Sequence, residues 1–218
     1  MKRGKELIYD ILVLNPLSNF SEYATYIEKN LEQEAKKYEK QLAEFDHEEV
    51  TEEWEKEFED MVESVLDDMT PFTHYFPEIM RSSLLISVYA FFEEKLISTC
   101  KGEKNSLQFS NIRGNSTIER AQIYIEKVMK IDFPSNNKHW KFLRNVNKIR
   151  NCFVHNGGKI NKDKSERLNN IIEDMDNIHV NERGKIVIEK DFIEGMIMHV
   201  DSFLSMLYLE TDILAKRK

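Results

Sequence analysis

The chain has 218 residues, of which 41% are hydrophobic, 11% aromatic and 32% charged, with only seven glycines and four prolines. So few turn-forming residues argue against a sheet-rich chain, and the many aromatic residues argue against a disordered one. Taken alone, the formal net charge of −8 is unfavourable for a protein that binds nucleic acid. The cysteines, Cys100 and Cys152, are far apart and predict neither a disulfide nor a zinc site, which suits the cytoplasm.

The first third of the chain is predicted to be helical. Apolar residues recur every three or four positions over 27–45 and again over 50–69, which is typical of amphipathic helices. A break in this phase at 46–49 leaves open whether the segment forms two helices or one kinked helix. We expect residues 1–72 to form an acidic helical extension that packs on a core of residues 73–218.

The core is predicted to begin with its most apolar helix. Pro71 and Pro77 indicate a join, and residues 78–101 then form a helix that is apolar on most sides and belongs at the centre of the fold. Ser116 and Glu119 have the spacing of a capping box, which starts a helix that ends near residue 130.

The C-terminal half is predicted to contain three more helices and one hairpin. The first of these helices carries an apolar stripe from residue 140 and should end at Asn156, before Gly157. A short helix at 165–176 precedes a β-hairpin at 178–188, and a final helix fills 191–215. The fold class is therefore all-α, a helical bundle with at most one small β-hairpin.

Common signatures of membrane spans, cofactors and metals are missing from the sequence. The most apolar stretch, residues 83–92, is too short to cross a membrane. The chain has no glycine-rich phosphate loop, and the segment at His47 lacks the second histidine of a zinc-protease motif. We therefore predict a cytoplasmic protein with no membrane association, no cofactor and no metal.

The strongest candidate site is the segment Arg150-Asn151-x-x-x-His155. Arginine offers a permanent charge and a planar fork of donors for phosphate oxygens. Histidine titrates near neutral pH and can take a proton from a ribose 2′-hydroxyl or give one to the leaving oxygen. Together they can cleave a phosphodiester without a metal.

Helix geometry places these residues on two faces. Asn151 and His155 share a polar face with the candidate RNA-binding residues Arg144, Asn147 and Lys148. Arg150 and His155, in contrast, are about 140° apart around an ideal helix. They can meet at one phosphate if the helix loosens at its end, or if a second copy of the chain contributes across a twofold axis.

The segment resembles the RNxxxH form of the motif of the HEPN (higher eukaryotes and prokaryotes nucleotide-binding) superfamily, and the helix 81–100 is similar to that family's earlier core helix. The resemblance covers residues 75–215 and makes the N-terminal helices an elaboration. It implies an α-helical homodimer formed through the Arg150–His155 helix, which acts as a metal-independent endoribonuclease in a toxin, phage-defence or RNA-processing role. An antitoxin or regulatory protein is then a candidate partner.

The same resemblance implies roles for individual residues. Arg150 and His155 would be catalytic, Asn151 would support them, and an acid of the earlier helix would lie near the arginine. Glu93 fits this acid better than Glu94, because its helical neighbours put it on a buried face, where a carboxylate needs a partner.

Other interpretations stay open at this point. Arg150 could be a purely structural ion-pair partner of Glu93, and His155 a histidine favoured by the helix C-terminus. The chain could be a non-catalytic HEPN-like dimer that binds RNA, a nucleotide or a protein, or it could be a helical scaffold.

The uneven distribution of charge removes the objection to an RNA substrate. Residues 22–68 hold 18 acidic and 5 basic residues, whereas residues 101–164 hold 14 basic and 5 acidic ones. A basic region of this kind attracts a phosphate backbone. The acidic arm is then a candidate for shielding or regulating the basic site.

Overall fold

A computed structural model describes residues 2–45, 54–100, 107–160, 165–211 and 213. It confirms the all-α class, with one two-stranded antiparallel hairpin among the described residues. The helices and strands are α1 (Lys2–Tyr9), α2 (Asn15–Phe45), α3 (Glu55–Thr70), α4 (Phe76–Cys100), α5 (Thr117–Ile123), α6 (Lys138–Asn156), α7 (Ser165–Glu173), β1 (Ile178–Val180), β2 (Ile186–Ile188) and α8 (Phe192–Ser205).

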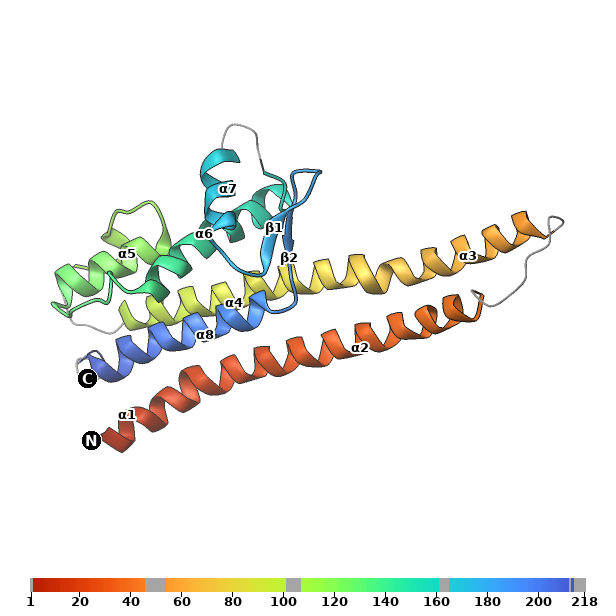
Figure 1. Cartoon of the computed structure of the whole chain (residues 1–218). Coiled ribbons are helices and arrows are strands. Elements are labelled where there is room, and N and C mark those ends of the chain that lie inside the picture. The colour runs from red at the N-terminus through yellow and green to blue at the C-terminus, as the bar shows by residue number, and fades with distance from the viewer. Residues whose placement is uncertain (1, 46–53, 101–106, 161–164, 212, 214–218) are drawn as a thin grey trace.

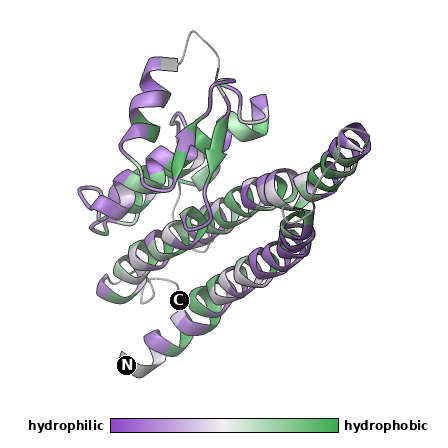
Figure 2. Cartoon of the chain, turned by 45° about the vertical axis from the view of Figure 1, so that its right-hand side comes forward, coloured by the Kyte–Doolittle hydropathy of each residue, from purple (hydrophilic) through white to green (hydrophobic). Residues whose placement is uncertain are grey.

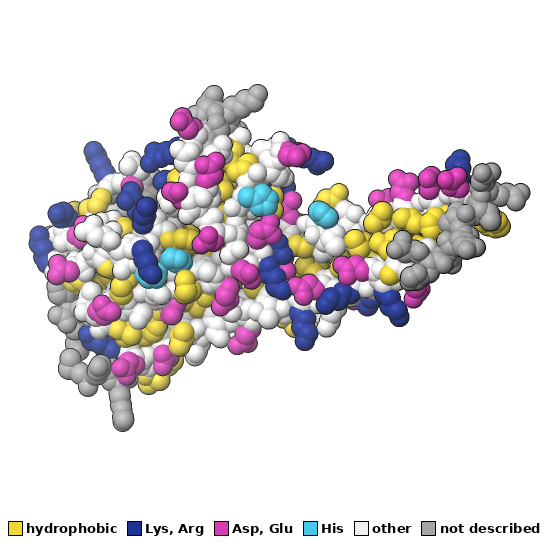
Figure 3. Space-filling view, viewed as in Figure 1, with side chains coloured by type: hydrophobic (Ala, Val, Ile, Leu, Met, Phe, Trp, Pro, Cys, Tyr) yellow, Lys and Arg dark blue, Asp and Glu magenta, His cyan; other side chains and the backbone are white. Residues whose placement is uncertain are grey.

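Two long antiparallel helical rods dominate the molecule (Figures 1 and 2). In the first rod, a π-helical turn at Asp10–Leu14 joins α1 to α2, and in the second, a π-helical turn at Pro71–Tyr75 joins α3 to α4. The two apolar series of the sequence thus form two helices, while the phase break at 46–49 lies outside the described residues. Acidic side chains line the exposed side of α3 (Figure 3).

The predicted join at Pro71 and Pro77 is wrong, because the helix continues through both prolines. Proline lacks an N–H, and its ring clashes with a preceding carbonyl in a regular helix. Here the backbone widens into the π turn, in which the N–H of Phe76 donates to the carbonyl of Pro71. The second rod therefore reaches from the acidic tip to the centre of the fold.

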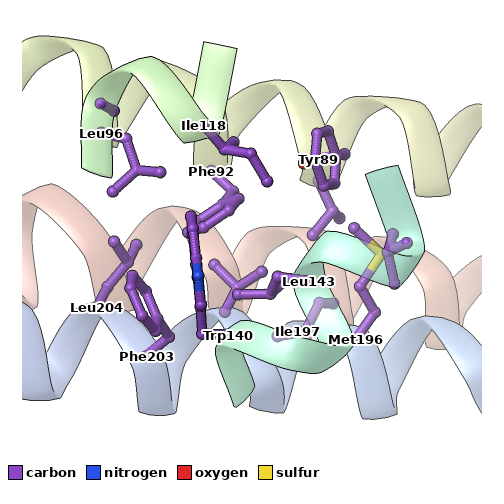
Figure 4. Close-up of a cluster of buried hydrophobic side chains, with 14 of the residues drawn as sticks. Tyr89, Phe92, Leu96, Ile118, Trp140, Leu143, Met196, Ile197, Phe203 and Leu204 are labelled. Carbon is purple, nitrogen blue, oxygen red and sulfur yellow. The ribbon is translucent and has the colours of Figure 1, made fainter. Parts of the chain in front are cut away.

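The core surrounds α4, which packs against α2, α5, α6 and α8. Figure 4 shows its aromatic centre, where Trp140 stacks on Phe203 at 5.1 Å between ring centroids and meets Phe92 at 6.4 Å. All three side chains are almost completely buried. The predicted position of the most apolar helix is thereby confirmed.

A buried ion pair ties the first rod to the core. Arg81 of α4 donates to both carboxylate oxygens of Glu28 on α2, at 2.7 and 3.0 Å, and to the carbonyl of Ile188 at 3.0 Å. The hairpin forms where it was predicted, with Ile178 opposite Ile188 and its turn closed by Gly184 at a φ of +69°. One arginine thus connects α2, α4 and β2.

The C-terminal helix is the one described helix that fits a membrane span by length and composition. That stretch, Phe192–Glu210, comprises α8 and a following π-helical turn at Met206–Glu210, and half of it is buried inside the protein. A core helix of a soluble protein passes the same test. The predicted continuation toward residue 215 falls mostly outside the described residues.

Candidate functional site

The candidate site lies on α6, which is capped at both ends and whose C-terminal end forms as the sequence predicts. The side chain of Asn137 accepts from the N–H of His139 at 2.8 Å and caps the start of the helix. At the other end Gly157 adopts the left-handed conformation, with a φ of +59°, and its N–H donates to the carbonyl of Phe153. The helix remains regular up to Asn156, so its last turn does not loosen.

The structure brings Arg150, Asn151 and Glu93 together. A terminal nitrogen of Arg150 contacts Glu93 Oε2 on α4 at 3.1 Å, and the other donates to Asn151 Oδ1 at 3.0 Å. The arginine also lies over the ring of Tyr89, 5.6 Å from its centroid. The guanidinium is therefore held on three sides, and 24% of its side chain stays exposed.

Burial dominates the electrostatics of this cluster. Burial raises the pKa of Glu93. The positive charge of Arg150 opposes this rise, as do a hydrogen bond from Thr117 and the positive charge of Arg120, but together they offset it only in part. Burial also raises the pKa of Tyr89 well above its ordinary value, which the nearby Glu93 carboxylate reinforces. Two buried polar atoms here, the Tyr89 hydroxyl and Arg150 Nε, have no hydrogen-bond partner among the described residues.

His155 is not part of this cluster. It lies one helical turn beyond Asn151, and it is exposed near the end of α6. Within the part of the chain that the structure describes, its ring forms no hydrogen bond or ion pair. A single copy of the chain thus shows a held arginine and a free histidine on different faces of one helix.

The predicted RNA-binding residues lie on α6 in the turns that precede His155. Arg144 is 54% exposed and lies 3.8 Å from Glu119, while Lys148 donates to Asn145 Oδ1 at 3.4 Å. Asn147 is half-buried on the same helix. Partial burial, and then the positive charges of Arg167 and Arg144, lower the pKa of Lys148. In Figure 3, lysine and arginine side chains are numerous at the left of the molecule, the region that holds α5 and the start of α6 in Figure 1.

Sequence reasoning missed two members of the site. Tyr89 has a sequence signal, because it precedes Glu93 by four residues and so lies on the same face of α4. Arg167 has none, since its place near Lys148 depends on how α7 packs against α6. Among the described residues, no group of three or more histidines, cysteines and acids could hold a metal ion.

Comparison with known proteins gives no further assignment. No family model, no curated protein and no solved structure matches this chain significantly. Its function must therefore be inferred from the site itself.

Proposed function

We propose that the protein is a metal-independent endoribonuclease of the HEPN type, with its chemistry on α6. The observation that carries this proposal is the arginine held by Glu93 and Asn151 on a helix that ends with an exposed histidine. A positioned cation and a free imidazole are the two groups that cleavage by a 2′-hydroxyl requires.

The chemistry follows from the two side chains. His155 takes the proton of the ribose 2′-hydroxyl, whose oxygen attacks the adjacent phosphorus. Arg150 stabilises the negative charge that develops on the phosphate oxygens, an effect worth about 3–4 kcal/mol in comparable sites. The bond to the 5′-oxygen then breaks, and this oxygen takes up the proton that His155 gained, directly or through water, which leaves a 2′,3′-cyclic phosphate and a 5′-hydroxyl end and restores the neutral imidazole.

The active site is composed of two chains. Arg150 and His155 are about 140° apart around α6, and the helix stays regular through both of them. We infer a homodimer in which α6 packs near its twofold copy, so that Arg150 of one chain and His155 of the other face the same phosphate. Val154 supports this arrangement, because it is 47% exposed on the last turn of α6.

The basic surface of α6 holds the RNA backbone in this proposal. Lys148, Arg144 and Arg167 supply positive charge beside His155, and Asn147 supplies an amide. We propose a cytoplasmic toxin or phage-defence enzyme, for which an antitoxin or another regulatory protein would be a natural partner.

Cleavage of RNA in a chelator tests the proposal. The purified protein should cut RNA in EDTA and leave 2′,3′-cyclic phosphate ends, and Arg150→Ala and His155→Ala should each reduce the rate at least a hundredfold. Lys127→Ala serves as a matched control, because Lys127 is a cation outside the site. Cleavage that survives both site substitutions would remove α6 from the mechanism.

A second candidate function is a non-catalytic dimer that binds RNA, a nucleotide or a protein. The observation that favours it is the contact of both terminal nitrogens of Arg150 with groups of its own chain. RNA binding that depends on Lys148 and Arg144, without cleavage under any condition, would support this candidate.

A further inference from the structure

The exposed apolar surface is concentrated on the two N-terminal rods. Among the described residues, seventeen large hydrophobic side chains are exposed, and thirteen of them lie between residues 7 and 79. Where exposed apolar side chains form a contiguous patch, the patch marks an interaction site on a soluble protein. The green, hydrophobic residues of both rods are visible in Figure 2.

Part of this surface is a groove of about 750 Å³ between α2 and α4. Every residue that lines it is uncharged. On each helix the lining includes five positions spaced by four, three, four and four residues, from Pro16 to Leu31 on α2 and from Phe76 to Phe91 on α4. Phe20 and Phe91 close its floor, with their rings 6.1 Å apart.

The two helices resemble half of a four-helix bundle. Spacings of three and four residues place the apolar side chains of each helix on one stripe, which normally packs against facing helices. In the single chain no helix that the structure describes covers these two stripes, and they face solvent: Tyr23 is 52% exposed and Ile79 is 61% exposed. Two further helices with the same spacing would complete the bundle.

We propose that a second copy of this chain fills the groove, so that α2 and α4 of both copies form a four-helix bundle about a twofold axis perpendicular to the rods. An uncharged, regularly spaced face is self-complementary, because its copy presents the same ridges and buries no unpaired charge. Ser83 and Ser87 are exposed in the groove, where their small side chains allow close approach of the helices.

Charge and length fix the direction of the axis. The helix α3 carries seven acids and one lysine, so an axis parallel to the rods would bring two acidic tips together. A perpendicular axis points the tips in opposite directions. With α2 ending about 33 Å from Tyr23, they lie roughly 65 Å apart, far beyond the screening length of about 8 Å.

The groove itself fixes where the axis crosses α2. Its α2 side runs from residue 16 to residue 31, so its midpoint lies between residues 23 and 24. A twofold axis through that midpoint places Tyr23 of one copy beside Tyr23 of the other.

This interface is separate from the dimer of the proposed function. Ser87 and Tyr89 are about 200° apart around α4, so the groove and the Arg150 cluster lie on opposite sides of that helix. If both interfaces form, the copies assemble into a closed tetramer where the two twofold axes cross at right angles, and into a larger closed assembly or an open chain where they do not.

Chemical cross-linking tests the axis. With a short bis-maleimide, Tyr23→Cys should link to its own copy, because antiparallel helices pack about 8–10 Å apart at the axis. Leu7→Cys should link at least tenfold more slowly, because its two copies are roughly 48 Å apart. The unmodified chain measures the background of the buried Cys100 and Cys152. Equal linking of both variants, or of neither, would overturn the proposal.

Sedimentation separates the two interfaces. Ile79→Glu should at least halve the mass of the wild-type protein, whereas Met198→Glu, a matched change of a 54% exposed residue on α8, should not alter it. Unfolding curves check that both variants are folded. An unchanged mass for Ile79→Glu would reject the groove, and Val154→Glu reports independently on the α6 dimer.

Discussion

Removing the charge of Glu93 should not destabilise the protein, although Glu93 forms a salt bridge with Arg150. Burial raises the pKa of Glu93 even with the arginine 3.1 Å away, so the attraction does not fully offset the loss of water around the carboxylate. We therefore expect Glu93→Gln to be as stable as the wild type at pH 7, or more stable by about 0–1 kcal/mol. The gain stays small because the carboxyl side chain keeps 15% of its surface in water.

The opposite substitution should be costly. In Arg150→Met the carboxylate of Glu93 loses its cation while it remains mostly buried. Breaking a fully buried pair costs about 3–5 kcal/mol, and we expect about 2 kcal/mol here because Thr117 and Arg120 still face Glu93. For a chain of this length that lowers Tm by about 4–8 °C. Adding Glu93→Gln to Arg150→Met should recover most of the loss.

Urea unfolding of the four proteins at pH 7 and pH 4.5 measures these differences. A carboxyl group with a raised pKa contributes its full stability below its ordinary pKa and loses it as the pH rises through the folded-state value. Any advantage of Glu93→Gln should therefore be present at pH 7 and shrink at pH 4.5. A loss of 2 kcal/mol or more in Glu93→Gln at pH 7 would refute this reasoning and make the pair a stabilising bridge.

Three further predictions concern the fold around the site. Glu28→Ala should destabilise the protein by about 3–5 kcal/mol, because it removes the bidentate partner of the mostly buried Arg81 and leaves only the carboxylate of Glu189, at 3.9 Å. Burial lowers the pKa of His199 to about 4. The neutral ring therefore makes its full contribution to the free energy of unfolding above pH 6.5, and this contribution is lost as the pH falls toward 4. We expect that loss to be about 1–2 kcal/mol, because the ring is only partly buried. Gly158→Ala should cost about 2–4 kcal/mol, more than Gly157→Ala, because its Cβ would meet a side chain at 2.8 Å.

Thermal and urea unfolding check these three predictions. For the ion pair, Glu28→Ala combined with Arg81→Met should be more stable than Glu28→Ala alone, and equal stability would contradict the account. His199→Asn should flatten the dependence of stability on pH between 4 and 6.5, and an unchanged slope would assign the effect to other groups. For the glycines, similar losses at positions 157 and 158 would show that the contact with the Phe153 ring is relieved without cost.

Local signals explain why most elements could be predicted from the sequence. The left-handed glycine after Asn156 ends α6, and Ser116 Oγ accepts from the N–H of Glu119 at 3.3 Å, as the capping box requires. Periodicity also favours Glu93 over Glu94 for the acid near the arginine. Glu93 contacts Arg150, whereas Glu94 is 60% exposed beside a lysine of its own helix.

The remaining features depend on how distant segments pack. The continuous rod through Pro71 forms because a π turn accommodates the proline, a choice that tertiary contacts decide and composition does not. The position of Tyr89 under Arg150 requires the crossing of α4 and α6, and the approach of Arg167 requires the docking of α7. A helical period tells which face of a helix is buried, but it does not tell which residues of another helix meet that face.

A mixing experiment tests the central claim most directly. If Arg150 of one chain and His155 of the other form each active site, a dimer of one Arg150→Ala chain and one His155→Ala chain retains one intact site. Equal amounts of the two inactive variants, mixed and allowed to exchange chains, should then recover about a quarter of the wild-type RNA cleavage in EDTA, because half of the dimers are mixed and each has one of two sites. No recovery, with chain exchange verified by mass, would contradict a shared ribonuclease site on α6.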